Sequence, residues 1–219
     1  MKQETQTSLG AVVVAAGLSR RMGAFKPMLP LGDSTLIRSL LQRLRIAGAD
    51  HIVLVVGREG DRLIQHVADL GVDWVGNPDF ATTDMFRSVC IGLERIQGRC
   101  GRILFTPGDS PCFSPTSGVR LNQAMEQTGA DILIPAYQGR RGHPILLANR
   151  VLPYLLTYRG TGGLRGALQM YPGPQQVLEL EDPGLVLDAD TPEDYQHLLA
   201  YQRRLESLSP ERSPFSMNP

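Results

Sequence analysis

Short apolar stretches alternate with longer amphipathic stretches along most of the chain, which is the pattern of an α/β protein. The apolar stretches predict strands at 10–15, 51–56, 72–75, 102–106, 130–135 and 176–180. The amphipathic stretches predict helices at 34–47, 61–70, 84–96, 114–127, 151–157, 163–170 and 192–205. Repeated strand–helix alternation indicates a mostly parallel sheet with helices on both faces.

Local signals refine this pattern at three places. Ser34 is a candidate N-cap of its helix, and Pro192 stands in the first turn of the last helix, where proline is tolerated. Residues 137–144 are rich in turn formers and cations, and the apolar residues 145–147 follow them. We expect this segment to form an excursion or hairpin at the rim of the sheet.

The length of 219 residues suits one domain with a full hydrophobic core. We predict a single Rossmann-like, three-layer α/β domain over residues 10–206. Residues 1–9 are polar and are expected to be flexible, and the Ser- and Pro-rich residues 207–219 are expected to form a disordered tail. The sequence contains no internal repeat.

Composition indicates which class of partner the protein binds and in which compartment it is found. The 22 Lys and Arg residues balance the 22 Asp and Glu residues, which argues against binding nucleic acid through a basic surface. Cys90, Cys100 and Cys112 are odd in number and lack metal-ligand spacing, so reduced thiols in the cytoplasm are expected. The sequence has neither a signal-peptide pattern nor an apolar run long enough to span a membrane, and we expect a cytoplasmic monomer.

The loop after the first predicted strand carries the main candidate chemistry. It contains Gly17 and Gly23, which let the backbone approach a ligand, and the cations Arg20, Arg21 and Lys26. Backbone N–H groups and cations at the carboxyl end of a strand are what a triphosphate requires. The spacing fits neither a P-loop nor the dinucleotide fingerprint. An ordinary solvated basic loop is the alternative.

Acidic residues mark two further segments. Asp109 follows the strand 102–106 in a Pro-Gly-Asp turn, and its carboxylate suits Mg²⁺, although a simple turn or capping role is the alternative. Asp188 and Asp190 point the same way if the chain is extended there, so one of them is a candidate second ligand. Alternatively, Asp190 or Thr191 caps the last helix.

Other polar residues carry weaker signals. The glycine-rich stretch 160–166 misses the dinucleotide fingerprint by one residue, and it is interpreted as a loop and helix start near the second substrate. His143 lies in the cationic turn, where functional and structural roles are equally open. The remaining histidines are expected to be bystanders, and Cys112 is expected to be a small packed residue rather than a nucleophile.

Four motifs together resemble a known family. Residues 15–30 resemble the signature A-A-G-x-S-x-R-M-G-x-x-K-x-x-L-P, and G-D-x-P, R-G-H-P and D-x-D-T-P-E-D follow at 108–111, 141–144 and 188–194. These motifs are similar to those of the nucleotidyltransferases related to molybdenum-cofactor guanylyl- and cytidylyltransferases, over about residues 10–200. The resemblance implies a fold of the nucleotide-diphospho-sugar transferase type.

The resemblance also implies roles for individual residues. The implied nucleotide-binding residues are Ala15, Ala16, Gly17, Leu18, Ser19, Arg21, Gly23, Lys26 and Ser88. The implied catalytic residues are Arg21, Lys26 and Asp109, and the implied Mg²⁺ ligands are Asp109 and Asp190. Arg141, Gly142 and His143 are expected to bind the acceptor.

The cytidylyltransferase branch is favoured, because Ala16 stands where the guanylyl branch has glycine. We therefore expect a Mg²⁺-dependent transfer of CMP from CTP to the phosphate of the molybdenum-pterin cofactor, with release of pyrophosphate. A molybdoenzyme is a further expected partner. The alternatives are a related enzyme that uses GTP or another phosphorylated acceptor, and a non-catalytic carrier of the pterin cofactor.

Overall fold

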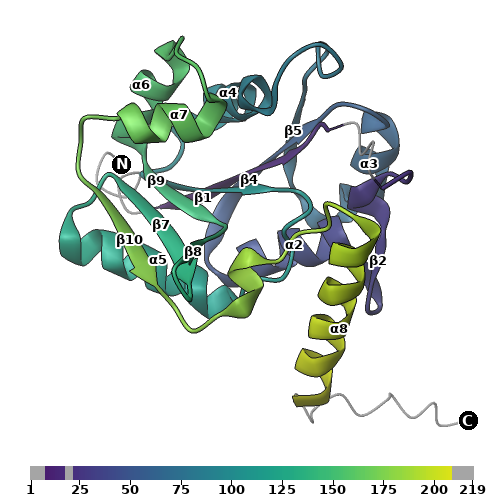
Figure 1. Cartoon of the computed structure of the whole chain (residues 1–219). Helices are drawn as coiled ribbons and strands as arrows, with labels where there is room; N and C mark the ends of the chain where they lie inside the picture. Colours follow the sequence, from purple (N-terminus) through teal and green to yellow (C-terminus); the bar gives the residue numbers. More distant parts are fainter. Residues whose placement is uncertain (1–7, 18–21, 209–219) are drawn as a thin grey trace, which may run out of the picture.

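The computed structural model describes residues 8–17 and 22–208, and one large sheet forms its middle layer (Figure 1). In this part of the chain the sheet has eight strands, in the order β10-β7-β9-β6-β1-β4-β5, with β8 paired to β7. The strands are β1 (Leu9–Ala15), β4 (Ala49–Val56), β5 (Asp73–Gly76), β6 (Arg102–Pro107), β7 (Ile132–Tyr137), β8 (Arg140–Arg141), β9 (Ile145–Ala148) and β10 (Gln175–Glu179). The six strands that the hydrophobic pattern predicted are all present.

The core of the sheet is parallel, as expected: β1 pairs in parallel with both β4 and β6. The segment 137–147 was expected to form an excursion or hairpin at the rim of the sheet, and this prediction is wrong for one of its two strands. β8 is a short strand at the side of β7, but β9 lies inside the sheet, antiparallel to both β6 and β7. All four residues of β9 are buried, because the strand is paired on both sides and is covered on both faces.

Helices cover both faces of the sheet, which confirms the three-layer arrangement. In Figure 1, α4, α6 and α7 lie above the sheet, and α2 and α5 lie below it. The helices are α2 (Leu36–Ile46), α3 (Gly60–His66), α4 (Met85–Ile96), α5 (Pro115–Thr128), α6 (Leu152–Thr157), α7 (Gly163–Met170) and α8 (Pro192–Leu208). No helix in the described residues is long and apolar enough to cross a membrane.

The helix α4 packs closely against the sheet because the face that it turns to the sheet is apolar and contains a glycine. Val89, Leu93 and Ile96 on this face are buried. Gly92 stands between them, and a Cβ atom at this position would collide with Val12 of β1 and with a side chain of β4. The close packing holds the first turn of α4 beside the carboxyl ends of β1 and β4.

Two predicted helix ends differ from the structure. Ser34 pairs with Leu31 in the hairpin of β2 (Pro30–Leu31) and β3 (Ser34–Thr35), so it is not the N-cap of α2. Thr35 is the N-cap instead, and its hydroxyl accepts a hydrogen bond from the backbone of Arg38. The helix predicted at 61–70 ends at His66, and a separate 3-10 turn (Ala68–Leu70) follows it.

The helix α8 extends from the main body and packs against the β2–β3 hairpin (Figure 1). A small second cluster of buried residues joins them, and it contains Leu31, Leu36, Cys112, Ala189 and Leu198. Strand β1 begins one residue before, and α8 ends two residues after, the predicted domain limits of 10 and 206. Residues 1–7 and 209–219 lie outside the described part of the chain.

Candidate active site

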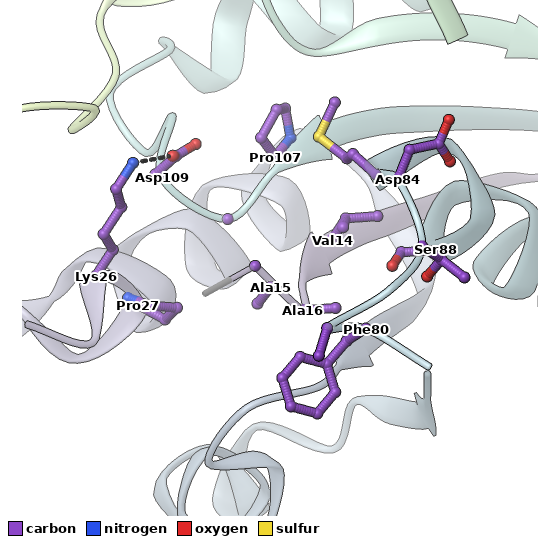
Figure 2. Close-up of a pocket in the computed structure, with 15 residues that line it drawn as sticks. Val14, Ala15, Ala16, Lys26, Pro27, Phe80, Asp84, Ser88, Pro107 and Asp109 are labelled. Atoms are coloured by element: carbon purple, nitrogen blue, oxygen red, sulfur yellow. Dashed lines mark hydrogen bonds and ion pairs between the residues drawn. The ribbon is translucent and has the colours of Figure 1, made fainter. Parts of the chain in front are cut away.

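A pocket of about 440 Å³ opens at the carboxyl ends of β1 and β6, where open α/β sheets bind their ligands (Figure 2). The loop after β6 lies close to β1, and it begins with a glycine that leaves little room for a side chain. A Cβ atom on Gly108 would lie 3.1 Å from the Cβ atom of Ala15. The backbone N–H of Gly108 also donates to Val14 at 2.9 Å. The two motif-bearing loops therefore lie on the same pocket.

The end of β1 forms part of the pocket wall, as the sequence predicts. Ala15, Ala16 and Gly17 line it. Gly23 has a φ of +66°, which explains a glycine there, but it is not among the residues that line the pocket. Of the other predicted nucleotide-binding residues on this loop, Leu18, Ser19 and Arg21 lie outside the described residues, so their roles stay predictions.

Lys26 connects the first predicted motif to the two acidic motifs. Its side chain comes from the 3-10 turn η1 (Lys26–Met28), and the residue is only 8% exposed. The Lys26 Nζ lies 3.1 Å from Asp109 Oδ2 and 2.7 Å from Asp190 Oδ1. The structure thus brings together Lys26, Asp109 and Asp190, which the sequence predicted for one site.

A backbone contact explains how the last motif reaches the pocket. The backbone N–H of Ala189 donates to the carbonyl of Asp109 at 3.0 Å, which fixes the segment before α8 against the loop after β6. Asp190 contacts Lys26, whereas the side chain of Asp188 is exposed. Residues other than Asp190 cap α8. The hydroxyl of Thr191 accepts from the backbone N–H of Asp194, and the Asp194 carboxylate accepts from the backbone N–H of Thr191.

The two carboxylates keep the Lys26 ammonium charged. Burial alone lowers the pKa of Lys26, but the hydrogen bonds and charges of Asp190 and Asp109 outweigh it, so the pKa lies above its ordinary value. A charged amine at the mouth of the pocket suits the phosphates of a nucleotide.

The donor set around Lys26 also fits a magnesium ion that is shared with a substrate. In the described residues, no group of three or more His, Cys, Asp or Glu side chains could hold a metal alone. Asp109 and Asp190 nonetheless converge on one atom, the Lys26 Nζ. Mg²⁺ typically binds one or two carboxylates together with substrate phosphates and water, and two convergent carboxylates meet that requirement.

The other end of the pocket contains residues from the segment after β5 and from the start of α4. Ser88, which the sequence predicted, lines this end and is 3% exposed. Phe80, Thr83 and Asp84 line it as well, and the sequence analysis missed all three as site residues (Figure 2). One signal in the sequence could have indicated them. The turn that starts at Asn77 directly follows the parallel strand β5, so it lies at the carboxyl ends of the strands, where the pocket opens.

The three residues predicted for the acceptor lie together, but outside the lining of this pocket. Arg141 is exposed on β8. Gly142 packs against the backbone of Leu185 so closely that a side chain would collide with it. The ring of His143 packs edge-on against Phe105 at 5.7 Å, and its Nδ1 is buried with no partner among the described residues. Their role toward an acceptor stays a prediction.

Two other sequence interpretations concern the thiols and the glycine-rich stretch. Cys112 is fully buried, and burial raises the pKa of its thiol to about 12, as expected for a packed residue rather than a nucleophile. All three cysteines are free thiols. Within the stretch 160–166, Gly163 begins α7 and lies near Phe86 and Asp84, at the rim of the pocket.

Known proteins are similar to this chain in sequence and in fold. The molybdenum cofactor cytidylyltransferase of Escherichia coli (strain K12) is 29% identical over 190 residues, which cover 86% of this chain and 94% of that protein. Rv0371c from Mycobacterium tuberculosis H37Rv, solved in complex with manganese, is 27% identical, with a TM-score of 0.73 over 88% of this chain and 98% of that one. A nucleotidyl transferase from Methanothermobacter thermautotroptrophicus shares the fold, with a TM-score of 0.78 at 24% identity over 90% of this chain and 99% of that one.

A family profile covers most of the chain. The profile of the MobA-like NTP transferase domain matches residues 11–180, which include β1, the Lys26 turn and Asp109. The match therefore contains the pocket as well as the sheet. The chain belongs to the MobA-like NTP transferase family, and it is a nucleotidyltransferase.

Proposed function

We propose that this protein transfers CMP from CTP to the phosphate of the molybdenum-pterin cofactor and releases pyrophosphate. The observation that carries the proposal is the contact of Lys26 with both Asp109 and Asp190 at the mouth of the pocket. The choice of substrates is supported by the similarity to the E. coli molybdenum cofactor cytidylyltransferase. Ala16, in the place of a second glycine, supports CTP over GTP.

The reaction needs positioning and charge neutralisation more than acid–base chemistry. A phosphate oxygen of the acceptor attacks the α-phosphorus of CTP, and the bond from that phosphorus to the bridging oxygen of the β-phosphate breaks. The bonding electrons leave with pyrophosphate. A phosphate is already an anionic nucleophile, so no side chain has to remove a proton. The charge that develops on the α-phosphate and the leaving group is what the protein must stabilise.

Lys26 is suited to that task because its ammonium is buried, charged and held in place before the nucleotide binds. We propose that it contacts the α-phosphate or the leaving pyrophosphate, together with Arg21 from the preceding loop. Magnesium, held by Asp109 and Asp190, would supply further neutralisation of the triphosphate. The manganese complex of Rv0371c supports a divalent cation in this type of domain.

The acceptor is proposed to approach from the side of β8. Arg141 is exposed there, and the charge of Asp109 reaches the neighbouring His143, so this loop adjoins the acidic end of the pocket. We place the reaction in the cytoplasm, in keeping with the free thiols, and expect the product to pass to a molybdoenzyme.

The test is pyrophosphate release with each of the four ribonucleoside triphosphates, Mg²⁺ and the molybdenum-loaded pterin cofactor. We expect release with CTP and dependence on the cofactor. Release with GTP instead would assign the chain to a guanylyl-type reaction. Nucleotide and cofactor binding without release from any of the four would favour the carrier alternative. The Lys26→Met variant serves as the inactive reference.

A further inference from the structure

The loop after β6 and the segment before α8 carry the two carboxylates that contact Lys26, and they run side by side in opposite directions. At the pocket, the backbone N–H of Ala189 donates to the carbonyl of Asp109 at 3.0 Å. Further from the pocket, Gly184 packs on the backbone of Cys112 so closely that a Cβ atom would collide with it. Residue numbers fall along one segment as they rise along the other, so the two segments lie antiparallel.

A buried carboxylate, that of Asp182, joins the far ends of these two segments. Asp182 is 4% exposed. Its Oδ2 accepts from the backbone N–H of Ser114 and from the hydroxyl of Ser117, each at 2.7 Å, at the start of α5. Its Oδ1 accepts from the backbone N–H of Gly184 at 3.0 Å, and from the hydroxyl of Tyr201 at 3.5 Å. One side chain thus connects the loop after β6, the segment before α8 and α8 itself.

The arrangement of donors around Asp182 requires a carboxylate. Each of its two oxygens faces a backbone N–H, from Ser114 on one side and from Gly184 on the other, and a backbone N–H can only donate. An amide has a single acceptor oxygen, so in either orientation its NH₂ group would face one of these N–H groups. A buried donor that is left without an acceptor is costly, so an amide would break the connection on one side.

We propose that Asp182 is a positioning residue, which sets the carboxylate of Asp190 against that of Asp109. The Lys26 Nζ contacts both of these carboxylates, so their separation determines how well they hold a shared cation. Asp182 itself lies outside the pocket lining and acts through the two segments that it joins. This inference rests on the proposed metal-binding role of Asp109 and Asp190, and it extends the site to a buried residue outside the sequence motifs.

Asp182→Asn is the test, because the amide keeps the size of the side chain and removes one acceptor. Mn²⁺ binding in the presence of CTP is measured by electron paramagnetic resonance on the full chain, and CTP binding without metal is measured by calorimetry. We expect the Mn²⁺ affinity to fall about tenfold or more, as it does for residues that orient metal ligands without touching the metal. CTP binding without metal should change little, because Asp182 does not line the pocket.

Asp131→Asn is the matched control, because Asp131 is also a buried carboxylate, 6% exposed, that accepts hydrogen bonds from Arg150 and Tyr171. It stands just before β7, at the amino end of that strand and outside the pocket lining. Its replacement should lower the thermal stability and leave the Mn²⁺ affinity unchanged. Ser117→Ala removes one of the four donors to Asp182, so it should lower the Mn²⁺ affinity by a smaller factor than Asp182→Asn.

Thermal unfolding of each variant identifies a temperature at which all of them are folded. If Asp182→Asn does not fold, Ser117→Ala is compared with Asp131→Asn instead. A Mn²⁺ affinity equal to that of the wild type would overturn the inference, and so would equal losses in the variant and in Asp131→Asn, because such losses would reflect general destabilisation. If the Mn²⁺ affinity falls as expected but no pyrophosphate is released with the pterin cofactor, the positioning role stands and the proposed acceptor is wrong.

Discussion

Lys26 and Asp190 are 164 residues apart in the sequence, yet the Lys26 Nζ lies 2.7 Å from Asp190 Oδ1. The contact joins the first loop of the chain to the segment before its last helix. The contact joins a buried cation to a partly exposed carboxylate, because the side chains of Lys26 and Asp190 are 10% and 38% exposed. The site therefore exists only when the whole domain is folded.

Replacing Lys26 by methionine should abolish most of the activity, because methionine keeps the buried length of the side chain and removes its charge. We expect kcat/KM for pyrophosphate release to fall on the order of 10²-fold or more. Lys26→Arg should recover only part of the activity, because guanidinium has a different shape and donor geometry from an ammonium. Arg203→Met, an exposed cation of α8 outside the pocket lining, is the control for loss of a cation.

Wild-type turnover in Lys26→Met would show that the ammonium does not contact the reacting phosphates. Thermal unfolding should accompany the assay, since removal of Lys26 leaves Asp109 and Asp190 close together without their shared cation. If the variant does not fold, Lys26→Arg provides the comparison.

Replacing either carboxylate by its amide should weaken divalent-cation binding. We expect Asp109→Asn and Asp190→Asn each to lower the affinity for Mn²⁺, measured by electron paramagnetic resonance in the presence of CTP, and to lower turnover by about 100-fold. Glu193→Gln is the neighbouring control, because Glu193 is an exposed carboxylate in the first turn of α8. Unchanged turnover in Asp109→Asn would contradict the metal assignment.

His143 should make the folded state sensitive to acid. Burial lowers its pKa to about 4, although a backbone hydrogen bond of Phe105 and the charge of Asp109 partly oppose this effect. Between the unfolded pKa of 6.5 and the folded value, the unfolded chain binds more protons, so the free energy of unfolding falls as the pH falls. The loss attributable to this residue amounts to at most about 3 kcal/mol.

The measurement is urea unfolding of the wild type and of His143→Phe between pH 7.5 and 4, where an apolar ring can keep the packing against Phe105. The wild type should lose more stability than the variant across this range. His51→Gln, on an exposed position of β4, should follow the wild type. Parallel curves for the wild type and His143→Phe would rule out the predicted contribution.

Gly92→Val should destabilise the fold, although Gly92 itself does not line the pocket. The added side chain would collide with Val12 of β1, so α4 would have to move away from the sheet. Overpacking of this kind costs about 1–3 kcal/mol in the free energy of unfolding. Glu94→Val on the exposed face of the same helix has the same β-branched residue and should cost much less. Equal losses for the two variants would contradict the predicted collision, because helix propensity alone favours valine over glycine at position 92.

The fold was largely predictable because its strands are short, apolar and separated by amphipathic helices. The exception was β9, whose apolar pattern predicts burial but not its neighbours. Its apolar residues indicate that both faces are covered, yet nothing local says between which strands it lies. The N-cap of α2 was missed by one residue. Ser34 pairs with Leu31 in a hairpin, and the hydrophobic pattern does not reveal this hairpin.

The end of the site around Lys26 was also predictable, because Lys26, Asp109 and Asp190 stand in recognisable motifs. The other end of the pocket was not, apart from Ser88. Phe80, Thr83 and Asp84 carry no motif, and they line the pocket only because the segment after β5 and the start of α4 lie beside the end of β1.

The two ends of the pocket come from separate segments of the chain: the first turn of α4 at one end, and the Lys26, Asp109 and Asp190 segments at the other. In evolutionary terms, this separation lets one end of the pocket change while the other is kept. Substitutions in the first turn of α4 alter one wall of the pocket and leave the contacts of Lys26 with Asp109 and Asp190 intact.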